Sequence, residues 1–233
     1  MHKFRYESVI LAIGILLLGL CIYWGMVNVA QRGRVVSVRG LAEKEVKADH
    51  VIWPIAYRTT GNDLSALYNE IKTKNRLIID FLTQNGIAPK EITTAAPAIG
   101  DKKTNQYNTD QTGDRYYVKS VLTVSTKEVD KVIQLLPRMG ELLKNGIAVS
   151  SGDYETMVEY EFTSLNDIKP QMIEEATHNA REAAEKFAKD SDSDLGKIQS
   201  ATQGLFSIED RDQYTPYIKN VRVVTSVNFF LED

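Results

Sequence analysis

The feature that most constrains this chain is the apolar run Val9 to Val29, which contains 21 residues and no charged side chain. A helix of that length is roughly 31 Å long, which matches the hydrocarbon core of a bilayer at about 30 Å. Tyr23 and Trp24 lie toward its second end, where amphipathic rings favour the membrane interface. Because the run has no polar face, it predicts a membrane-spanning helix rather than the core helix of a soluble domain.

A cleaved signal peptide is the alternative interpretation of this run. Basic residues precede it, but Asn28-Val29-Ala30 is a poor small-x-small cleavage site, and the run exceeds the usual apolar region of about 7 to 15 residues. Lipidation at Cys21 is disfavoured because the bulky Leu20 precedes it. We favour an uncleaved anchor, with residues 1–33 as cytoplasmic tail, anchor and linker and residues 34–233 as a soluble domain. Positive charges on both sides of the run leave its orientation open.

Composition limits the function of the soluble part. After residue 33 the chain carries 25 basic and 30 acidic residues, a net charge of −5. A mildly acidic domain has no electrostatic reason to bind nucleic acid, so we expect no nucleic-acid partner. The single cysteine, Cys21, lies in the apolar run, which excludes an intrachain disulfide, a cysteine zinc site and a cysteine nucleophile from the soluble part.

Hydrophobic periodicity predicts an α+β fold, with an antiparallel or mixed sheet and about three helices packed on one side of it. The expected strands are residues 35–39, 51–57, 92–99, 116–126, 154–162, 200–208 and 221–231. The expected helices follow Gly61-Asn62-Asp63, follow a capping box formed by Ser125 and Glu128, and cover about 166–189 with Phe187 on the inner side.

Three prolines modify these elements. Pro54 inside a strand suggests an edge or a bulge, Pro97 weakens the strand 92–99, and Pro137 is expected to kink or divide the second helix.

The tetrapeptide Asn-Gly-Ile-Ala occurs twice, at Asn85 to Ala88 and at Asn145 to Ala148. Each copy follows a predicted helix and leads toward a strand, and glycine there tolerates the left-handed conformation of a helix C-terminus. The repeat suggests two related strand-helix-strand units, although four residues are equally compatible with coincidence. Between two predicted strands, Gly100 to Asp114 has no apolar periodicity and is expected to be a mobile hairpin loop.

The candidate catalytic or metal-binding residues are few. His50, beside Asp49 at a strand start, is interpreted as a solvated turn histidine, and His178 as part of a solvated charge array with Glu174, Glu175, Arg181 and Glu182. Glu155, Glu159 and Glu161 alternate with apolar residues, which amphipathicity explains without a catalytic role.

Sequence motifs add no specific chemistry. The chain contains no HExxH, GxSxG, P-loop or GxGxxG pattern. We therefore predict no catalytic, metal-binding or cofactor-binding residue and no cofactor. Tyrosines at 107, 116, 117, 214 and 217 are candidates for a contact surface, although about half of them are expected in the core.

With these elements laid out, the region from Val35 to Leu231 resembles the SIMPL-domain family of bacterial envelope proteins, which includes periplasmic immunogenic antigens of about this size. The matching features are Ser37-Val38-Arg39-Gly40 with Glu43 to Asp49 after it, Asn85-Gly86-Ile87, the helix Ala176 to Ala188 with Leu195-Gly196-Lys197-Ile198 after it, and the closing strand at Val221 to Val223. Two positions depart from the family pattern, Ala48 where proline is usual and Arg39 where serine is common.

The resemblance implies a domain exported across the bacterial inner membrane and held there by a single span, with the soluble part in the periplasm. It also implies ring-like or channel-like homo-oligomers in some members, an envelope protein partner and a role in envelope stress tolerance. It supplies no catalytic residue.

Three functions are therefore open. The leading one is a non-enzymatic, membrane-anchored envelope protein that acts by self-assembly or partner binding. The second is an anchored hydrolase that uses Glu155, Glu159, Glu161 or His178 as acid-base groups. The third is a small-ligand-binding domain with the Gly100 to Asp114 loop as a lid.

Overall fold

The computed structural model describes residues 3–31, 33–104, 113–150 and 154–232. These residues form two compact units, which are described separately. The first unit contains residues up to Lys44, Asn166–Ile208 and residues from Val221 onward, and the second contains Glu45–Leu165 and Glu209–Asn220.

The predicted apolar helix is present as α1 (Lys3–Gln31). Its segment Val9–Met26 has a mean hydropathy of 2.4, and none of it is buried in the protein. Length and composition suit either a membrane anchor or a signal sequence.

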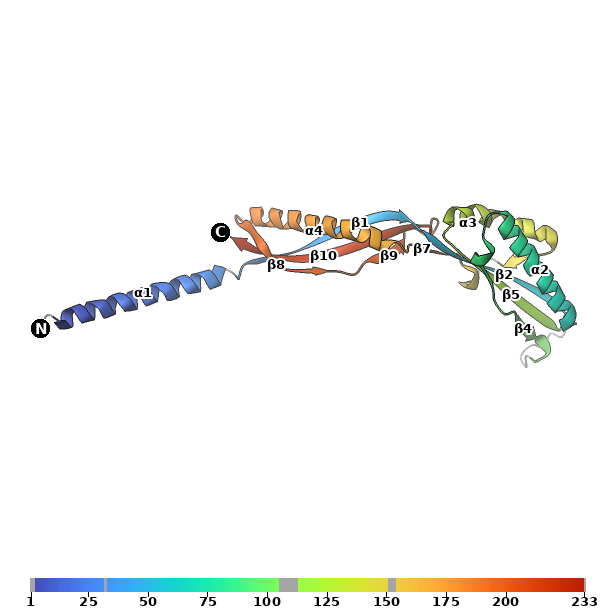
Figure 1. Cartoon of the computed structure of the whole chain (residues 1–233), viewed down its shortest axis with the longest axis horizontal. Helices are drawn as coiled ribbons and strands as arrows, with labels where there is room; N and C mark the ends of the chain where they lie inside the picture. Colours follow the sequence, from blue (N-terminus) through green and yellow to red (C-terminus); the bar gives the residue numbers. More distant parts are fainter. Residues whose placement is uncertain (1–2, 32, 105–112, 151–153, 233) are drawn as a thin grey trace. The chain divides into compact units, whose positions relative to one another are not determined.

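The first unit is a sheet with one long helix on it. The strands are β1 (Val35–Lys47), β10 (Ile218–Glu232) and β8 (Asp194–Gln203) in that order, and β9 (Ser207–Asp210) also pairs with β10. The helix α4 (Leu165–Asp190) runs along this sheet (Figure 1). Alternate residues of β10 from Val221 to Phe229 are buried, as the sequence predicted for the closing strand.

Small side chains bring α4 close to the sheet. Ala176, Ala180 and Ala184, spaced four residues apart, are completely buried. A Cβ atom on Gly40 of β1 would lie only 1.8 Å from the backbone oxygen of Ala176, so the strand and the helix meet at backbone distance. The expectation for Phe187 was wrong: it is 61% exposed, because the alanine stripe occupies the inner face. Gly40 also does not end the first strand, which continues to Lys47.

This close contact predicts that adding a methyl group at Gly40 destabilises the folded protein. In Gly40→Ala the new methyl group would overlap the α4 backbone, and overpacking of this kind lowers the free energy of unfolding by about 1 to 3 kcal/mol or more. Thermal unfolding of the full chain in detergent micelles, followed by circular dichroism, measures the loss. Gly140→Ala is the matched control, because nothing lies within 4 Å of where a Cβ atom on Gly140 would be. Equal melting temperatures for the two variants would contradict the contact.

The second unit follows the order strand, helix, strand, strand, helix, strand, with additional short elements. Its main elements are β2 (His50–Gly61), α2 (Leu64–Gln84), β3 (Ile92–Thr94), β4 (Ala98–Asp101), β5 (Tyr116–Thr126), α3 (Val129–Leu135), β6 (Val149–Ser150) and β7 (Glu159–Glu161). Short 3₁₀ helices cover Pro89–Glu91, Lys102–Thr104, Leu136–Asn145 and Tyr154–Thr156. The antiparallel sheet has the order β3-β5-β2-β6, which is the strand order of a ferredoxin-like βαββαβ motif. The fold is therefore α+β, as predicted.

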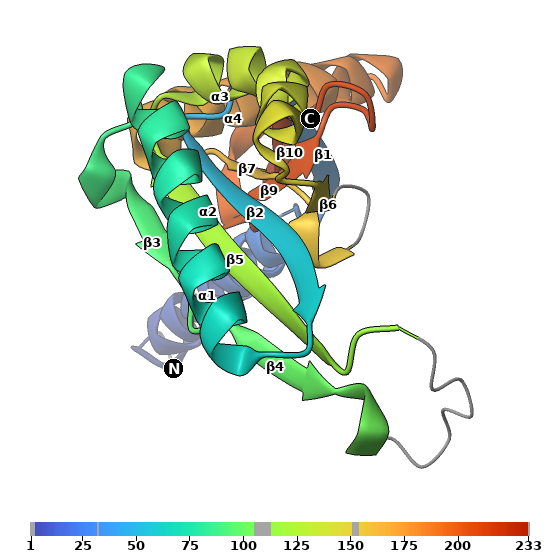
Figure 2. The ribbon, with the colours of Figure 1, turned by 90° about the vertical axis from the view of Figure 1, so that its right-hand side faces the viewer.

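One hydrophobic core lies between this sheet and its helices. Buried residues of β2 and β5, including Val51, Ile55 and Leu122, pack against Ile78 and Leu82 of α2. Figure 2 shows α2 lying across β2 and β5, with β3 and β4 on the outer side of β5.

The repeated tetrapeptide marks equivalent positions in the two halves of this motif. Gly86 (φ 90°) and Gly146 (φ 71°) both adopt the left-handed conformation at a helix end. The N–H of Ile87 donates to the oxygen of Leu82 at 3.1 Å, and the N–H of Ile147 donates to that of Leu142 at the same distance. Both isoleucines are then buried in the same core.

Several boundaries differ from the expected ones. Asp63 caps α2 as predicted, by accepting from the N–H groups of Ser65 and Ala66. The capping box at the second helix is not formed, since the Thr126 hydroxyl, and not Ser125, accepts from the N–H of Glu128 at 3.1 Å. The expected strand 92–99 is divided into β3 and β4 around Pro97, and Pro137 divides α3 from the 3₁₀ helix that follows. The expected strand 200–208 begins earlier as β8 and resumes after Gly204 as β9.

The expected strand 154–162 is mostly not a strand. Only Glu159–Glu161 pairs, with His50–Ile52 of β2, because β6 already occupies the positions opposite Ala56 and Tyr57. Pro54 pairs with β5 on one side of β2. On the other side, it lies in the gap between the segments that pair with β7 and with β6, so this proline is tolerated inside a central strand.

Candidate functional site

The structure brings together three polar side chains that the sequence analysis treated separately. His50 Nδ1 lies 3.0 Å from a carboxylate oxygen of Glu161, and His50 Nε2 lies 3.0 Å from the hydroxyl oxygen of Ser125. The three residues come from β2, β7 and β5, and strand register places them side by side. His50 begins β2, as expected for a residue at a strand start, but its side chain is only 21% exposed, so it is not the solvated histidine that the sequence suggested.

This cluster lies on the sheet face away from the core. Val51 and Trp53 of β2 point into the core, so His50 and Ile52 point to the opposite face. Ser125 is exposed, and the Glu161 side chain is 47% exposed, so solvent reaches both ends of the cluster. A serine, a histidine and a carboxylate in this order have the arrangement of nucleophile, base and orienting group.

The other acid-base candidates are not brought together. Glu155 lies in a 3₁₀ helix and not on a strand, and it forms an ion pair with Lys119 that lowers the pKa of its carboxyl group. Glu159 is exposed on β7. His178 is 68% exposed and lies 3.9 Å from Glu182, as expected for a solvated charge array. No group of three His, Cys, Asp or Glu side chains among the described residues could hold a metal ion.

Asp49 connects the start of β2 to the segment before α4. Its carboxylate accepts hydrogen bonds from the N–H groups of Thr163 at 2.7 Å and Ser164 at 2.9 Å, and from the Thr163 hydroxyl at 2.9 Å. Burial raises the pKa of Asp49, but the hydrogen bonds from Ser164 and Thr163 outweigh it, so the pKa lies below its ordinary value. This residue has a structural role that its position beside a histidine did not reveal.

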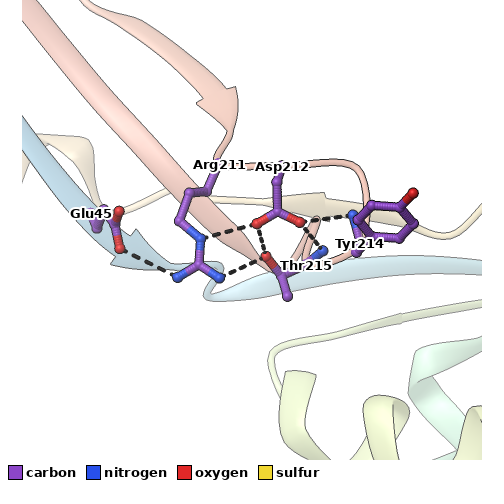
Figure 3. Close-up of polar contacts among 5 residues, drawn as sticks. All are labelled: Glu45, Arg211, Asp212, Tyr214 and Thr215. Carbon is purple, nitrogen blue, oxygen red and sulfur yellow. Dashed lines mark hydrogen bonds and ion pairs between the residues drawn. The ribbon is translucent and has the colours of Figure 1, made fainter.

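A second polar cluster organises the loop between β9 and β10 (Figure 3). Asp212 accepts from the N–H groups of Tyr214 and Thr215, both at 2.8 Å, and from the Thr215 hydroxyl. Arg211 donates to Asp212 at 3.1 Å and also reaches Glu45 at 3.4 Å. The hydrogen bonds from Thr215 and then Arg211 lower the pKa of Asp212 to about 2.

The hydrogen bonds to Asp212 predict that the loop between β9 and β10 loses stability in acid. The pKa of Asp212 in the folded protein lies below its ordinary value of 3.8, so the ionised carboxylate stabilises the fold above about pH 4. This contribution is lost as the pH falls toward 2. A carbon-13 NMR titration of the aspartate carboxyl groups should place the Asp212 midpoint near 2, and Thr215→Val should raise it toward 3.8. Thr73→Val is the control and should leave the midpoint unchanged. An ordinary midpoint in the native chain would contradict the arrangement.

The tyrosines proposed as a contact surface have different environments. Tyr214 is 82% exposed, whereas Tyr217 packs edge-on against Tyr160 with ring centroids 6.0 Å apart. Tyr116 and Tyr117 are half-buried and lie under guanidinium groups. Tyr107 lies outside the described residues, as does most of the expected loop from Gly100 to Asp114, whose central part is residues 105–112.

The longest run of exposed strand residues in the first unit lies on β8, at one end of its sheet. Its residues from Lys197 to Gln203 are all exposed, and no charged residue occurs between Ile198 and Ile208. Ile198 is 49% exposed and Leu205 is 95% exposed. On the opposite edge strand, β1, α4 covers part of the backbone, since Asn179 donates to the Leu41 oxygen at 2.8 Å and Gly40 contacts the helix backbone. An uncharged, exposed sheet edge is a site for pairing with another strand.

Comparison with known families gives one match. The family model for SIMPL, described as a protein of unknown function (DUF541), matches residues 36–225. The chain belongs to the SIMPL family. The SIMPL region begins within β1, after α1, and contains residues of both compact units. No curated protein matches this SIMPL chain. The family description names no activity.

Proposed function

We propose that this SIMPL protein is a membrane-anchored envelope protein that acts by self-assembly or partner binding, with its soluble part in the periplasm. The apolar helix α1 supports the anchor, since Val9–Met26 is long enough to span and is not buried in the protein. The resemblance to envelope members of the family supports the compartment. On this proposal the protein needs no catalytic group.

The exposed edge at β8 is the observation that carries the assembly proposal. Thr202 and Ala201 pair with Ser226 and Val227 of β10 on one side of the strand. The other side of β8 is the end of the sheet, where backbone N–H and C=O groups are available to another chain.

Two features limit how this edge can pair. Register shifts between Asn228 and Phe229 and between Phe229 and Leu231 show that the first half of β8 is irregular, and Lys197 adds a charge there. Bulges and lysines weaken edge pairing. The regular half, Ser200–Gln203, with the exposed Ile198 and Leu205 on either side of it, is therefore the part expected to meet a second copy of the chain.

The test adds charge at this edge in the full chain. Intact cells producing the protein are treated with a membrane-impermeant amine crosslinker and the products are separated by size. We expect crosslinked oligomers of the native chain, because the soluble part is outside the inner membrane and self-associates. In Ile198→Glu with Leu205→Glu the oligomers should fall at least fivefold, because like charges would face each other and a carboxylate would be desolvated.

A double variant in the second unit provides the control. Leu143 and Tyr214 are also exposed, at 61% and 82%, so Leu143→Glu with Tyr214→Glu adds the same charge elsewhere and should leave the oligomers intact. A native chain that gives only monomer would refute self-assembly, and oligomers that survive charge at β8 would refute this edge as the interface.

A second candidate function is favoured by the Ser125–His50–Glu161 cluster, which gives the hydrolase hypothesis a specific arrangement. On this candidate, the Ser125 oxygen bonds to the carbonyl carbon of an ester while its proton passes to His50 Nε2. The same proton goes to the leaving alcohol as the ester C–O bond breaks. Water then gives a proton to His50 as its oxygen bonds to the acyl carbon, and His50 returns that proton to the Ser125 oxygen as the bond between Ser125 and the acyl group breaks, which releases a carboxylic acid. Glu161 holds the imidazole in orientation.

The candidate predicts covalent labelling of one serine. A fluorophosphonate probe should modify Ser125 in the native full chain, as located by peptide mass spectrometry. Labelling should fall at least tenfold in His50→Gln, which keeps the size of the side chain but removes the base. Ser200→Ala, at an exposed serine of β8, should label like the native chain. Failure to label Ser125, or equal labelling with and without His50, would eliminate this function.

A further inference from the structure

A groove in the second unit lies between α2 and the sheet edge formed by β3. It has a volume of about 720 Å³, within the range of ligand sites. Tyr68, Lys72 and Arg76 of α2 form one wall, and Thr94 and the segment leading to Pro97 form the other. Ile71 and Ile79 supply an apolar floor. The groove is lined by residues whose helix and strand both belong to the same compact unit.

The helical wall carries two positive side chains that form no ion pair among the described residues. Lys72 and Arg76 are exposed, and none of the ion pairs formed by the described residues involves either of them. They are four residues apart, a spacing at which like charges repel across one helical turn. By contrast, Lys74 on another face of the same helix is paired with Glu70. An anionic group in the groove would relieve the repulsion.

The strand wall offers backbone hydrogen bonds. In the antiparallel pair of β3 and β5, Thr94 is opposite Leu122, and the N–H of Ala95 donates to the oxygen of Val121 at 3.0 Å. Bonded and non-bonded positions alternate in such a pair, so the N–H and C=O of Thr94 point away from β5, toward the open edge. Ile92 follows the same alternation, because its N–H donates to the backbone oxygen of Pro89 and not to β5.

The spacing of the two walls selects the form of the ligand. Residues four apart on a helix are separated by about 6 Å along its axis, and alternate residues of an extended strand by about 6.6 Å. An extended segment with acidic residues at positions i and i+2 could therefore place one carboxylate at Lys72 and the other at Arg76. The same segment could exchange backbone hydrogen bonds with Thr94, which is strand addition at a sheet edge.

We propose that this groove binds an extended acidic peptide segment of a partner protein, with the pattern acidic-x-acidic flanked by aliphatic residues. The carboxylates pair with Lys72 and Arg76, the flanking aliphatic side chains contact the apolar floor, and the peptide backbone pairs with Thr94. A free anion or a lipid headgroup would use the two charges but neither the apolar floor nor the strand edge. The proposal names a partner class at a surface separate from β8, so it does not depend on self-assembly there.

The binding experiment uses the full chain in nanodiscs of zwitterionic lipid. The probe is a fluorescein-labelled peptide of sequence Val-Thr-Glu-Thr-Glu-Thr-Val with an amidated C-terminus, followed by fluorescence anisotropy. We expect saturable binding, and at least tenfold weaker binding of the matched peptide in which both Glu residues are Gln. Equal binding of the two peptides, or no binding of either, would overturn the proposal.

Variants test the two walls separately. Lys72→Glu with Arg76→Glu should weaken binding of the acidic peptide at least tenfold and should allow binding of the peptide with Lys at both Glu positions. Lys186→Glu with Lys189→Glu, at exposed residues of α4, is the matched control and should bind normally. Thr94→Pro removes the edge N–H and should weaken binding, whereas Thr94→Val keeps it and should not.

Further outcomes distinguish the alternatives. Competition by inorganic phosphate as strong as by unlabelled peptide would indicate a general anion site and overturn the peptide assignment. A third outcome is that the native chain binds vesicles containing anionic lipid but binds no peptide, and that Lys72→Glu with Arg76→Glu abolishes the vesicle binding. That outcome would assign the groove to a lipid surface instead. The Ile198→Glu with Leu205→Glu chain should bind the peptide normally, so failure of self-assembly and failure of this proposal are separable.

Discussion

The second unit depends on the pairing of β2 with β5 over eleven consecutive positions, from Val51 with Thr126 to Gly61 with Tyr116. A shift of one residue would move every core side chain of one strand to the opposite face. The same register places Ser125 within reach of His50, and it positions β3 on the outer side of β5. The core, the polar cluster and the groove therefore all depend on one set of backbone hydrogen bonds.

The first unit is held together by a different kind of packing between helix and sheet. Its helix α4 meets the sheet through alanines and a glycine, so the backbones approach closely, and large sheet side chains such as Phe229 pack beside the alanines. The helix covers part of the β1 edge, where Asn179 donates to the Leu41 oxygen, whereas among the described residues no strand pairs with the outer side of β8. The two edges of this sheet therefore differ in how accessible they are to another strand.

The charged side chains of the described residues differ in whether they have a partner within the protein. Most ion pairs of the described residues lie on exposed faces, where each contributes little to stability. Lys72 and Arg76 differ because they face a groove and have no acidic partner among the described residues. The polar groups at Asp49 and Asp212 are instead fully used in holding loops, since each carboxylate accepts several hydrogen bonds. Groups without such partners are the better candidates for binding another molecule.

The sequence by itself determined the features that depend on neighbouring residues. The length of the apolar run, the Asp63 cap, the strand Tyr116–Thr126 and the two glycine helix ends all follow from local hydropathy, capping and backbone freedom. The order of diffuse motifs along the chain also sufficed to indicate the family that the comparison confirmed.

Only the tertiary structure decided which distant residues meet. Ser125 and Glu161 lie 75 and 111 residues after His50 in the chain, and no periodicity could show that their strands are adjacent. The division of the strand 154–162, the exposure of Phe187 and the groove between Lys72 and Thr94 have the same origin. Each depends on strand order and on competition for one partner edge, and these are long-range packing properties that local propensity does not contain.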